Sequence, residues 1–363
     1  MYPPIDCQLP TLIASAAVGA ILFEPVWYKS KLSFAFGPVL SKNKTTKISS
    51  GIIPNVKKQT ILDQLLLWIR GNIFIPDARL MWVKPSVKYL EKYIYENGIT
   101  TIITSGPPHS LHLIGLELKQ KLNVRWVADF RDPWTTIGYH KALKLSEFAS
   151  NKHKQLENKV LNTADLILVT SPSTRAEFKK ITSKPIEVIT NGYDEEKIGN
   201  QIVDKKFSLA HIGSFLSERN PRILWESISE LIRENPLFAS HFQLKLIGAV
   251  SQEVLDSIAL FQLQNYVLNL GYVSHDEAIA HQKKSQVLLL IEINSEDTKS
   301  IIPGKLFEYM VSERPIIGVG PKGCDFAEIL IDTNTGVFAD YSEKEKLKKR
   351  AKQNIEFKKL WIF

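Results

Sequence analysis

Cysteine is scarce in this chain of 363 residues: only Cys7 and Cys324 occur, and they lie far apart. Neither has the close partners that a zinc site needs, and one distant pair provides no disulfide framework. The eight histidines show no ligand spacing, and no Asp-x-Asp pair follows a strand-like run. The sequence therefore predicts a reducing compartment, the cytoplasm, and no bound metal.

Long apolar runs and the short motifs of several enzyme classes are also missing. The apolar run at 12–23 (LIASAAVGAILF) is shorter than the roughly 20 residues that span a bilayer. No Lys or Arg precedes it, as one would in a signal peptide, so we expect a buried strand or a short helix. The chain has no Gly-x-Ser-x-Gly and no Walker-type loop, which argues against hydrolase and kinase functions.

The charge that is present is positive. Lys and Arg number 46 against 38 Asp and Glu, a net charge of +8, which suits an anionic ligand, a nucleic acid or an acidic membrane surface. No aromatic platform or recognition helix accompanies the charge, so we expect no nucleic-acid partner. The basic end at 344–359 (KEKLKKRAKQNIEFKK) is either a peripheral membrane contact or a charged helix in solvent, and both interpretations stay open.

Strand-like and helix-like segments alternate along the chain on both sides of a polar stretch, Asn191 to Lys206. Continuous apolar strands separated by amphipathic helices are typical of parallel sheets that are covered on both faces. We therefore predict an α/β fold with two Rossmann-like domains that face a cleft, joined at this stretch. Capping boxes are expected at Thr174 with Glu177 and at Ser274 with Glu277, and a helix is expected to open at Pro221.

Ligand sites in open parallel sheets lie beyond the carboxyl ends of the strands, where Gly213 and Gly248 follow two of the predicted strands. A glycine at such a turn lets a phosphate approach the backbone, and the following helix N-terminus favours an anion. Arg219 adds a mobile positive charge six residues after Gly213. Each signal alone is most often only a turn, but together they predict a nucleotide site.

The segment 300–312 (SIIPGKLFEYMVS) adds a third turn of this kind. Gly304 and Lys305 open a predicted helix, and Glu308 lies one turn further among apolar residues. A carboxylate is costly to bury without a partner. Glu308 therefore either points into solvent or waits for a ligand, and it could accept hydrogen bonds from both hydroxyls of a ribose.

These motifs resemble those of the retaining GT-B glycosyltransferases. In that family a Lys that contacts the diphosphate follows a strand-end Gly by six positions, and Gly213 with Arg219 keeps this spacing and charge. EYMVSERPII is similar to the family's Glu-Ala-Met-Ala-x-Gly-x-Pro-Val motif, which makes Glu308 the ribose-binding residue. PGKLFEYM looks like the variant in bacterial surface-polysaccharide enzymes. TSGPPHSLHLIGLELKQKLNVRWVADFRDPW and VITNGYDEE extend the resemblance over roughly 77–340.

The chain departs from the family's pattern in several places. Ser214 stands where the family has an Arg after the first Gly, and Ser300 stands where the first Glu of a Glu-x7-Glu pair contacts the donor sugar. The usual opening strand and Gly-rich loop are not visible before Cys7, so we expect a chain shortened at its N-terminus. The end soon after Lys359 leaves a shortened C-terminus open as well.

The resemblance implies transfer of a sugar from a nucleotide-sugar donor to a polysaccharide or lipid-linked acceptor, with retention and without a metal or other cofactor. It implies an acceptor-side domain at 1–195, a donor-binding domain at 206–345 and a basic segment at 346–363. The protein would act in the cytoplasm, with peripheral contact at the inner face of the membrane left open. An inactive truncated nucleotide-binding remnant and a GT-B-type nucleotide-sugar epimerase remain alternatives. The donor-binding residues would be Gly213, Ser214, Arg219, Gly248, Gly304, Lys305 and Glu308.

The predicted catalytic residues are Asp132 and His109, which follow strands of the first half. Either side chain could orient the acceptor hydroxyl or accept its proton. His109 could instead be a helix N-cap, and Asp132 could be a loop residue paired with Arg131. The two interpretations of each residue remain open at this point.

Overall fold

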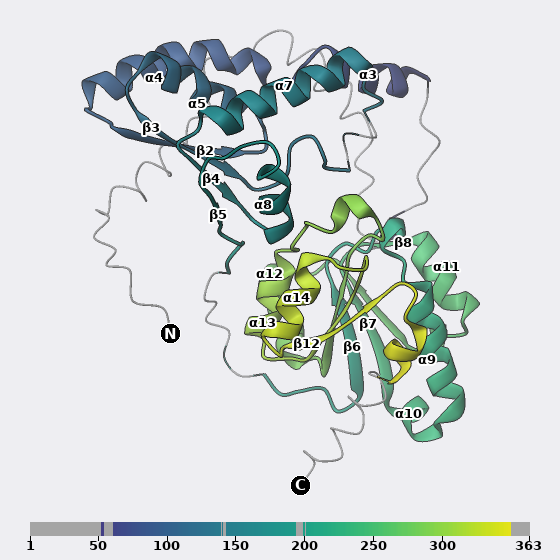
Figure 1. Cartoon of the computed structure of the whole chain (residues 1–363). Helices are drawn as coiled ribbons and strands as arrows, with labels where there is room; N and C mark the ends of the chain where they lie inside the picture. Colours follow the sequence, from purple (N-terminus) through teal and green to yellow (C-terminus); the bar gives the residue numbers. More distant parts are fainter. Residues whose placement is uncertain are drawn as a thin grey trace.

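The computed structural model describes residues 52–53, 61–138, 140, 143–193, 199 and 201–349. The apolar run at 12–23, part of the predicted linker and the basic stretch beyond residue 349 lie outside the described residues. The described part forms two α/β bodies with parallel sheets, one above the other in Figure 1, which confirms the prediction of two Rossmann-like domains. The predicted boundaries at 195, 206 and 345 stay predictions, although β5 ends at Val188 and β6 begins at Phe207.

The N-terminal sheet has four parallel strands in the order β2-β3-β4-β5. Helices α3, α4, α5 and α7 lie along one side of it, and α8 lies on the other (Figure 1). Its core is built around Trp126, Phe130 and Trp134, all fully buried. The strands are Thr101–Gly106, Arg125–Phe130, Leu166–Val169 and Ile186–Val188; helices α3, α4, α5, α7 and α8 are Ile61–Asn72, Val83–Glu96, Ser110–Lys121, Glu147–Thr163 and Pro172–Phe178, with the 3-10 turn η1 at Leu80–Trp82.

The C-terminal sheet has six parallel strands in the order β12-β11-β10-β6-β7-β9. Successive residues of β6 and β10 enter different cores, Leu209 and Leu289 on one face and Ala210 and Leu290 on the other. Both faces are therefore covered, as the continuous apolar runs predicted. The strands, in chain order, are β6 Phe207–Ile212, β7 Phe242–Ile247, β9 Val267–Gly271, β10 Val287–Ile291, β11 Ile316–Gly320 and β12 Gly336–Asp340.

Among the described elements, α9, α10 and α11 lie on one side of this sheet and α12, α13 and α14 lie on the other (Figure 1). The helices are Arg222–Glu234, Pro236–His241, Gln252–Leu260, His275–Lys284, Lys305–Val311 and Asp325–Asp332, with 3-10 turns η2, η3 and η4 at Ser217–Arg219, Gln264–Tyr266 and Glu296–Thr298. A short parallel pair joins β1 (Ile52–Ile53) to β8 (Val250–Ser251), so a strand that precedes the N-terminal sheet pairs within the C-terminal body.

The two bodies touch where helices α8 and α14 begin. Asp325 is buried, and its carboxylate accepts hydrogen bonds from the backbone N–H of Ser173 at 3.1 Å and from the Ser173 hydroxyl at 2.6 Å. A carboxylate that receives both donors of a helix start is well stabilised there. This contact links the strand-end side of the N-terminal sheet to that of the C-terminal sheet.

The local helix signals gave mixed results. The capping box of Ser274 and Glu277 is present at the start of α12, as predicted. The predicted capping box of Thr174 and Glu177 is wrong: α8 begins at Pro172, and Ser171 is its N-cap. The Ser171–Pro172 pair is the stronger start, because proline at the first helical position sacrifices no hydrogen bond. The predicted start at Pro221 is one residue early, since α9 begins at Arg222 with Pro221 as N-cap.

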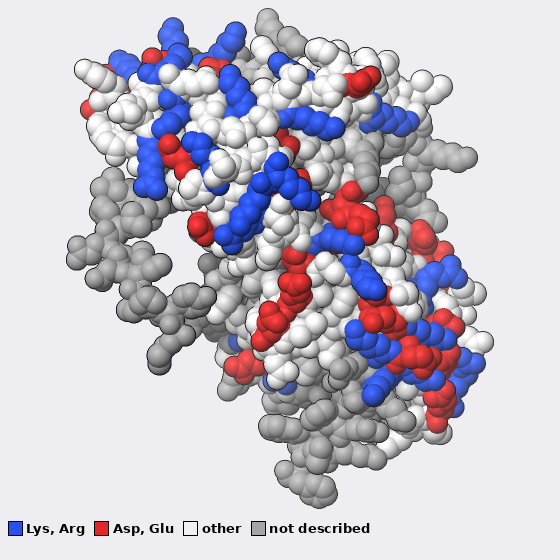
Figure 2. Space-filling view, viewed as in Figure 1, with Lys and Arg blue, Asp and Glu red and all other residues white. Residues whose placement is uncertain are grey.

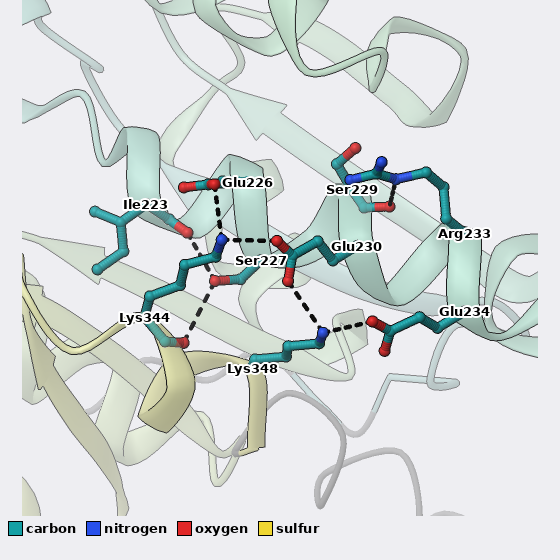
Figure 3. A network of polar contacts seen from close by, with 9 residues as sticks. All are labelled: Ile223, Glu226, Ser227, Ser229, Glu230, Arg233, Glu234, Lys344 and Lys348. Atoms are coloured by element: carbon teal, nitrogen blue, oxygen red, sulfur yellow. Dashed lines mark hydrogen bonds and ion pairs between the residues drawn. The ribbon is translucent and has the colours of Figure 1, made fainter.

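The basic C-terminal segment is partly neutralised where it is described. Figure 2 shows positive and negative side chains interleaved over α9, and Figure 3 shows their contacts. Lys344 bridges Glu226 and Glu230, both at 2.7 Å, while Lys348 bridges Glu230 and Glu234 at 3.0 and 2.6 Å. The hydrogen bonds from Lys344 and then Lys348 lower the pKa of Glu230 to about 2. These two lysines therefore join the segment to α9.

Tyr309 fixes helix α13 to the end of strand β6. Its hydroxyl accepts a hydrogen bond from the Ile212 N–H at 3.0 Å and donates one to the Ile212 carbonyl at 3.3 Å. The side chain is fully buried, and burial raises its pKa. One phenol thus satisfies both backbone groups of the last residue of β6, where the ladder ends.

We expect Tyr309→Phe to lower the free energy of unfolding by roughly 1 to 3 kcal/mol, because two buried backbone groups lose their partner. Urea unfolding followed by circular dichroism measures the change. Tyr272→Phe is the matched control, since Tyr272 is exposed. Equal stability of both variants would show that the Tyr309 hydroxyl does not hold α13 in place.

Candidate functional site

Glycines lie at the carboxyl ends of three neighbouring strands of the C-terminal sheet: Gly213 follows β6, Gly248 follows β7, and Gly271 is the last residue of β9. The N–H of Gly213, after β6, donates to the Ile247 carbonyl at 2.6 Å, and the N–H of Gly248, after β7, donates to the Gly271 carbonyl at 2.6 Å. Gly213 and Gly248 have φ values of +119° and +116°, which side-chain-bearing residues rarely adopt. A Cβ on Gly248 would lie 2.5 Å from the Gly213 carbonyl oxygen, so the two turns are stacked too closely for any larger residue.

Lys305 lies directly over this edge. A Cβ on Gly213 would fall 1.7 Å from the Lys305 Nζ, so the ammonium occupies the space that the glycine leaves. Burial and then the charge of Arg219 lower the pKa of Lys305, while Glu308 and Glu292 raise it. Since α13 starts at Lys305 and Tyr309 anchors its next turn to Ile212, the packing of α13 determines where the ammonium lies.

Arg219 approaches the same edge from the turn η2, and it has a partner that the sequence analysis missed. Its Nη2 lies 3.3 and 3.4 Å from the carboxylate oxygens of Glu292, which is 1% exposed. The Ile293 N–H also donates to Glu292 Oε1 at 2.8 Å. Glu292 follows the five buried residues of β10, and an acid at the end of such a run was the signal that could have identified it.

Glu308 lies one turn after Lys305 on α13, so the two side chains share a helix face. Its Oε2 accepts a hydrogen bond from Nε2 of the buried Gln282 on α12 at 3.2 Å. Glu308 itself is half-buried. A carboxylate held on one side by an amide keeps lone pairs for further donors.

The structure brings most of the predicted donor-binding residues together. Gly213, Gly248, Lys305 and Arg219 meet at the carboxyl edge of β6 and β7, and Glu308 adjoins Lys305. Ser214 is exposed beside Gly213, and Gly304 is exposed immediately before α13. The other two predicted residues, Asp132 and His109, belong to the N-terminal sheet.

His109 lies in an aromatic cluster at the ends of β2 and β3. Its ring stacks on Trp134 at 4.7 Å with an interplanar angle of 2°, and both ring nitrogens are buried without a hydrogen-bond partner among the described residues. It occupies the N-cap position of α5, but its side chain makes no capping bond. Asp77 performs that role, since its carboxylate accepts from the Ser110 N–H at 2.8 Å. Burial, followed by nearby histidines, holds the pKa of His109 well below its usual value.

Asp132 lies in the loop after β3 and is half-buried. Burial raises its pKa, and the charge of Arg131 opposes this. Arg131 does not pair with it: the guanidinium bonds Asn191 and lies 3.6 Å from Asp129. The interpretation of Asp132 as the ion-pair partner of Arg131 is therefore wrong, and its carboxylate makes no hydrogen bond with another described residue.

Buried groups hold the loop that follows Asp132. Glu157 on α7 is buried and accepts from the Thr135 N–H at 3.1 Å and from its hydroxyl at 2.7 Å. Burial raises the pKa of Glu157. Trp134 donates its indole N–H to Nδ1 of the buried His153 at 3.2 Å. No spacing pattern along the chain indicates this support, because α7 and the loop meet only in the tertiary structure.

No group of three or more His, Cys, Asp or Glu side chains in the described part of the chain is placed to hold a metal ion. None of the helices in the described ranges combines the length and apolar character needed to cross a membrane.

Two family models match the chain in succession. The model of Glycosyltransferase Family 4 matches residues 57–197, and that of Glycosyl transferases group 1 matches residues 206–356. No curated protein sequence matches this chain significantly.

Solved structures with the same fold include sucrose-phosphate synthase from Thermosynechococcus elongatus, 16% identical with a TM-score of 0.54, over 77% of this chain and 70% of that one. A glycosyltransferase from Rickettsia africae ESF-5 is 12% identical with a TM-score of 0.52, over 83% and 73%. The lipopolysaccharide outer core galactosyltransferase WaaB is 15% identical with a TM-score of 0.50, over 75% and 70%. At these identities the likeness establishes the fold.

The buried histidines of the N-terminal body make its stability depend on pH. Burial lowers the pKa of His112 to about 3 and that of His140 to about 4, and it also lowers those of His109 and His153. In the unfolded chain a histidine titrates near 6.5, so below that pH the unfolded state binds more protons than the folded one. The stabilisation that these neutral histidines contribute is fully present above about pH 6.5. It is lost as the pH falls toward their pKa values in the folded protein.

We expect the free energy of unfolding to fall by roughly 1 to 2 kcal/mol per buried histidine between pH 6.5 and 5. Urea titrations at several pH values measure the slope. His109→Phe removes one buried histidine and keeps the stack on Trp134, so the free energy of unfolding of this variant should depend less steeply on pH. His241→Phe, at an exposed position of the other body, is the control and keeps the wild-type slope.

Proposed function

The chain belongs to the family 4-like GT-B glycosyltransferases, enzymes that transfer sugar from nucleotide-sugars, and we propose that it delivers the sugar to a polysaccharide or lipid-linked acceptor with retention of configuration. The observation that carries the proposal is the Lys305 ammonium over Gly213, with Glu308 one turn along the same helix. This arrangement matches the two ends of a nucleoside diphosphate.

In the proposed complex the diphosphate lies on the backbone at Gly213 and Gly248. Lys305 and Arg219 contact its oxygens, and Ser214 and Gly304 border it from their exposed turns. Their positive charges stabilise the departing nucleoside diphosphate, which is where negative charge develops in the transfer. These two cations would supply the stabilisation, so the proposal includes no metal or other cofactor.

Glu308 accepts the ribose hydroxyls in this proposal. It lies on the same face as Lys305, so a nucleotide whose phosphates meet the ammonium can place its ribose at the carboxylate. The Gln282 amide holds one oxygen of Glu308 at 3.2 Å and leaves the other for the sugar. Two hydroxyl donors on a charged acceptor form strong hydrogen bonds.

The acceptor side belongs to the N-terminal body, and Asp132 is the better placed of the two predicted residues. Its carboxylate is half-buried and makes no hydrogen bond with another described residue, and burial raises its pKa toward the range of a general base. His109 is neutral at pH 7, but its ring is stacked and its nitrogens are buried. We therefore assign acceptor orientation to Asp132 and packing of the strand end to His109.

The acceptor class follows from the resemblance to surface-polysaccharide enzymes, and the fold neighbour WaaB acts on the lipopolysaccharide outer core. Nucleotide-sugars and a chain with only two cysteines both suit the cytoplasm. A peripheral membrane contact would bring the enzyme to a lipid-linked acceptor. Lys344 and Lys348 are occupied by α9, so such a contact would have to use other basic residues.

We expect Glu308→Gln to weaken nucleoside diphosphate binding by roughly 1.5 to 3 kcal/mol, the value of hydrogen bonds to a charged group, while the protein stays folded. Calorimetric titration with UDP, GDP and ADP measures the affinity. Glu313→Gln, an exposed acid just beyond the same helix, is the control. Affinity equal to that of the wild type would return Glu308 to the interpretation as a solvent-facing acid.

The acceptor assignment is tested with a labelled nucleotide-sugar that the wild-type chain transfers. Asp132→Asn should slow transfer about 100- to 10,000-fold with donor binding near normal, because general base assistance is lost. His109→Phe should retain most activity, because it preserves the stack on Trp134. Slow transfer by His109→Phe together with a near wild-type rate for Asp132→Asn would make His109 the base. Wild-type transfer rates for both variants would indicate that the donor phosphate accepts the proton.

A further inference from the structure

Glu292 has an unusual position for an acid that no ligand can reach. It is 1% exposed at the carboxyl end of β10, directly below the edge where Arg219 and Lys305 lie. The Ile293 N–H binds its Oε1 at 2.8 Å, and the Tyr341 hydroxyl donates to its backbone carbonyl at 2.9 Å. The Ile293 bond holds the carboxylate, and the Tyr341 bond holds the backbone of the same residue.

Both carboxylate oxygens of Glu292 face Nη2 of Arg219, at 3.3 and 3.4 Å. The Arg219 side chain is 27% exposed, so it is not wholly covered while its Nη2 rests on Glu292. A guanidinium carries five N–H donors in a planar fork, and two neighbours can share it. Arg219 comes from a three-residue turn, η2, which alone would leave its long side chain many rotamers.

Glu292 has a second effect at this edge, because its charge raises the pKa of Lys305. Burial and then the charge of Arg219 lower the pKa of Lys305, so the two cations repel each other, while Glu308 and Glu292 oppose this. Burial and then the charge of Lys305 lower the pKa of the buried His211 to about 3, so it stays neutral and adds no third positive charge. Glu292 is thus the buried anion that faces both cations.

We propose that Glu292 is a positioning residue that holds the Arg219 guanidinium at the phosphate-binding edge and keeps it beside Lys305. The proposal rests on the proposed nucleotide function of this edge. Without the carboxylate, the guanidinium would turn away from Lys305 into solvent, and the diphosphate would lose a pre-organised contact.

The test compares Glu292→Gln with Glu218→Gln, an exposed acid next to Arg219, in calorimetric titrations with UDP, GDP and ADP. Glu292→Gln should weaken binding roughly 10- to 100-fold, the scale of a lost charged hydrogen bond, and Glu218→Gln should change it little. In an Arg219→Gln background, Glu292→Gln should change the nucleotide affinity less than about twofold, because the two residues act as one unit. Glu292→Asp keeps the charge and should recover part of the affinity.

A pH series separates positioning from a loss of stability. Binding weakens at high pH where Lys305 loses its proton, and removal of the Glu292 charge should move this alkaline limb to lower pH. Equal or tighter binding by Glu292→Gln, or an additive effect with Arg219→Gln, would overturn the inference. A wild-type chain that binds none of the three nucleotides would instead contradict the proposed function, so the two failures are distinguishable.

Discussion

The close approach of Lys305 to Gly213 is the constraint on which the rest of the site depends. An ammonium group can occupy the position of a side chain only where the residue beneath it has none. Tyr309 fixes the position of α13 for this approach, because its hydroxyl bonds both backbone groups of Ile212, the last residue of β6. The backbone turn, the helix start and the positive charge are therefore one packed unit.

That unit has an electrostatic cost, which the buried Glu292 and the half-buried Glu308 offset. Two cations near one strand edge repel each other, and burial further disfavours the charged form of Lys305. Glu292 and Glu308 oppose this from below and from the next helical turn. The edge consequently keeps a positive field for an anionic ligand without an isolated buried charge.

The N-terminal body is organised by different forces. Its strand ends are filled with rings: His109 stacks on Trp134, and His112 stacks on Phe130 at 4.2 Å. These histidines are neutral because burial lowers their pKa values, so they pack like aromatic residues. Among the described residues, Asp132 has a raised pKa from burial and makes no ion pair, so this edge also holds an uncompensated carboxyl group.

The amino-acid sequence by itself determined the two parallel sheets, the glycine turns and the helix that carries Lys305 and Glu308. Apolar periodicity, glycine position and the spacing of charges are local properties, so they can be read along the chain. Only the tertiary structure decided that Glu292 supports Arg219, that Asp77 rather than His109 caps α5, and that Arg131 bonds Asn191 instead of Asp132. Each of these contacts joins residues from separate elements. Their partners are decided by how helices and strands pack, and no local pattern encodes that packing.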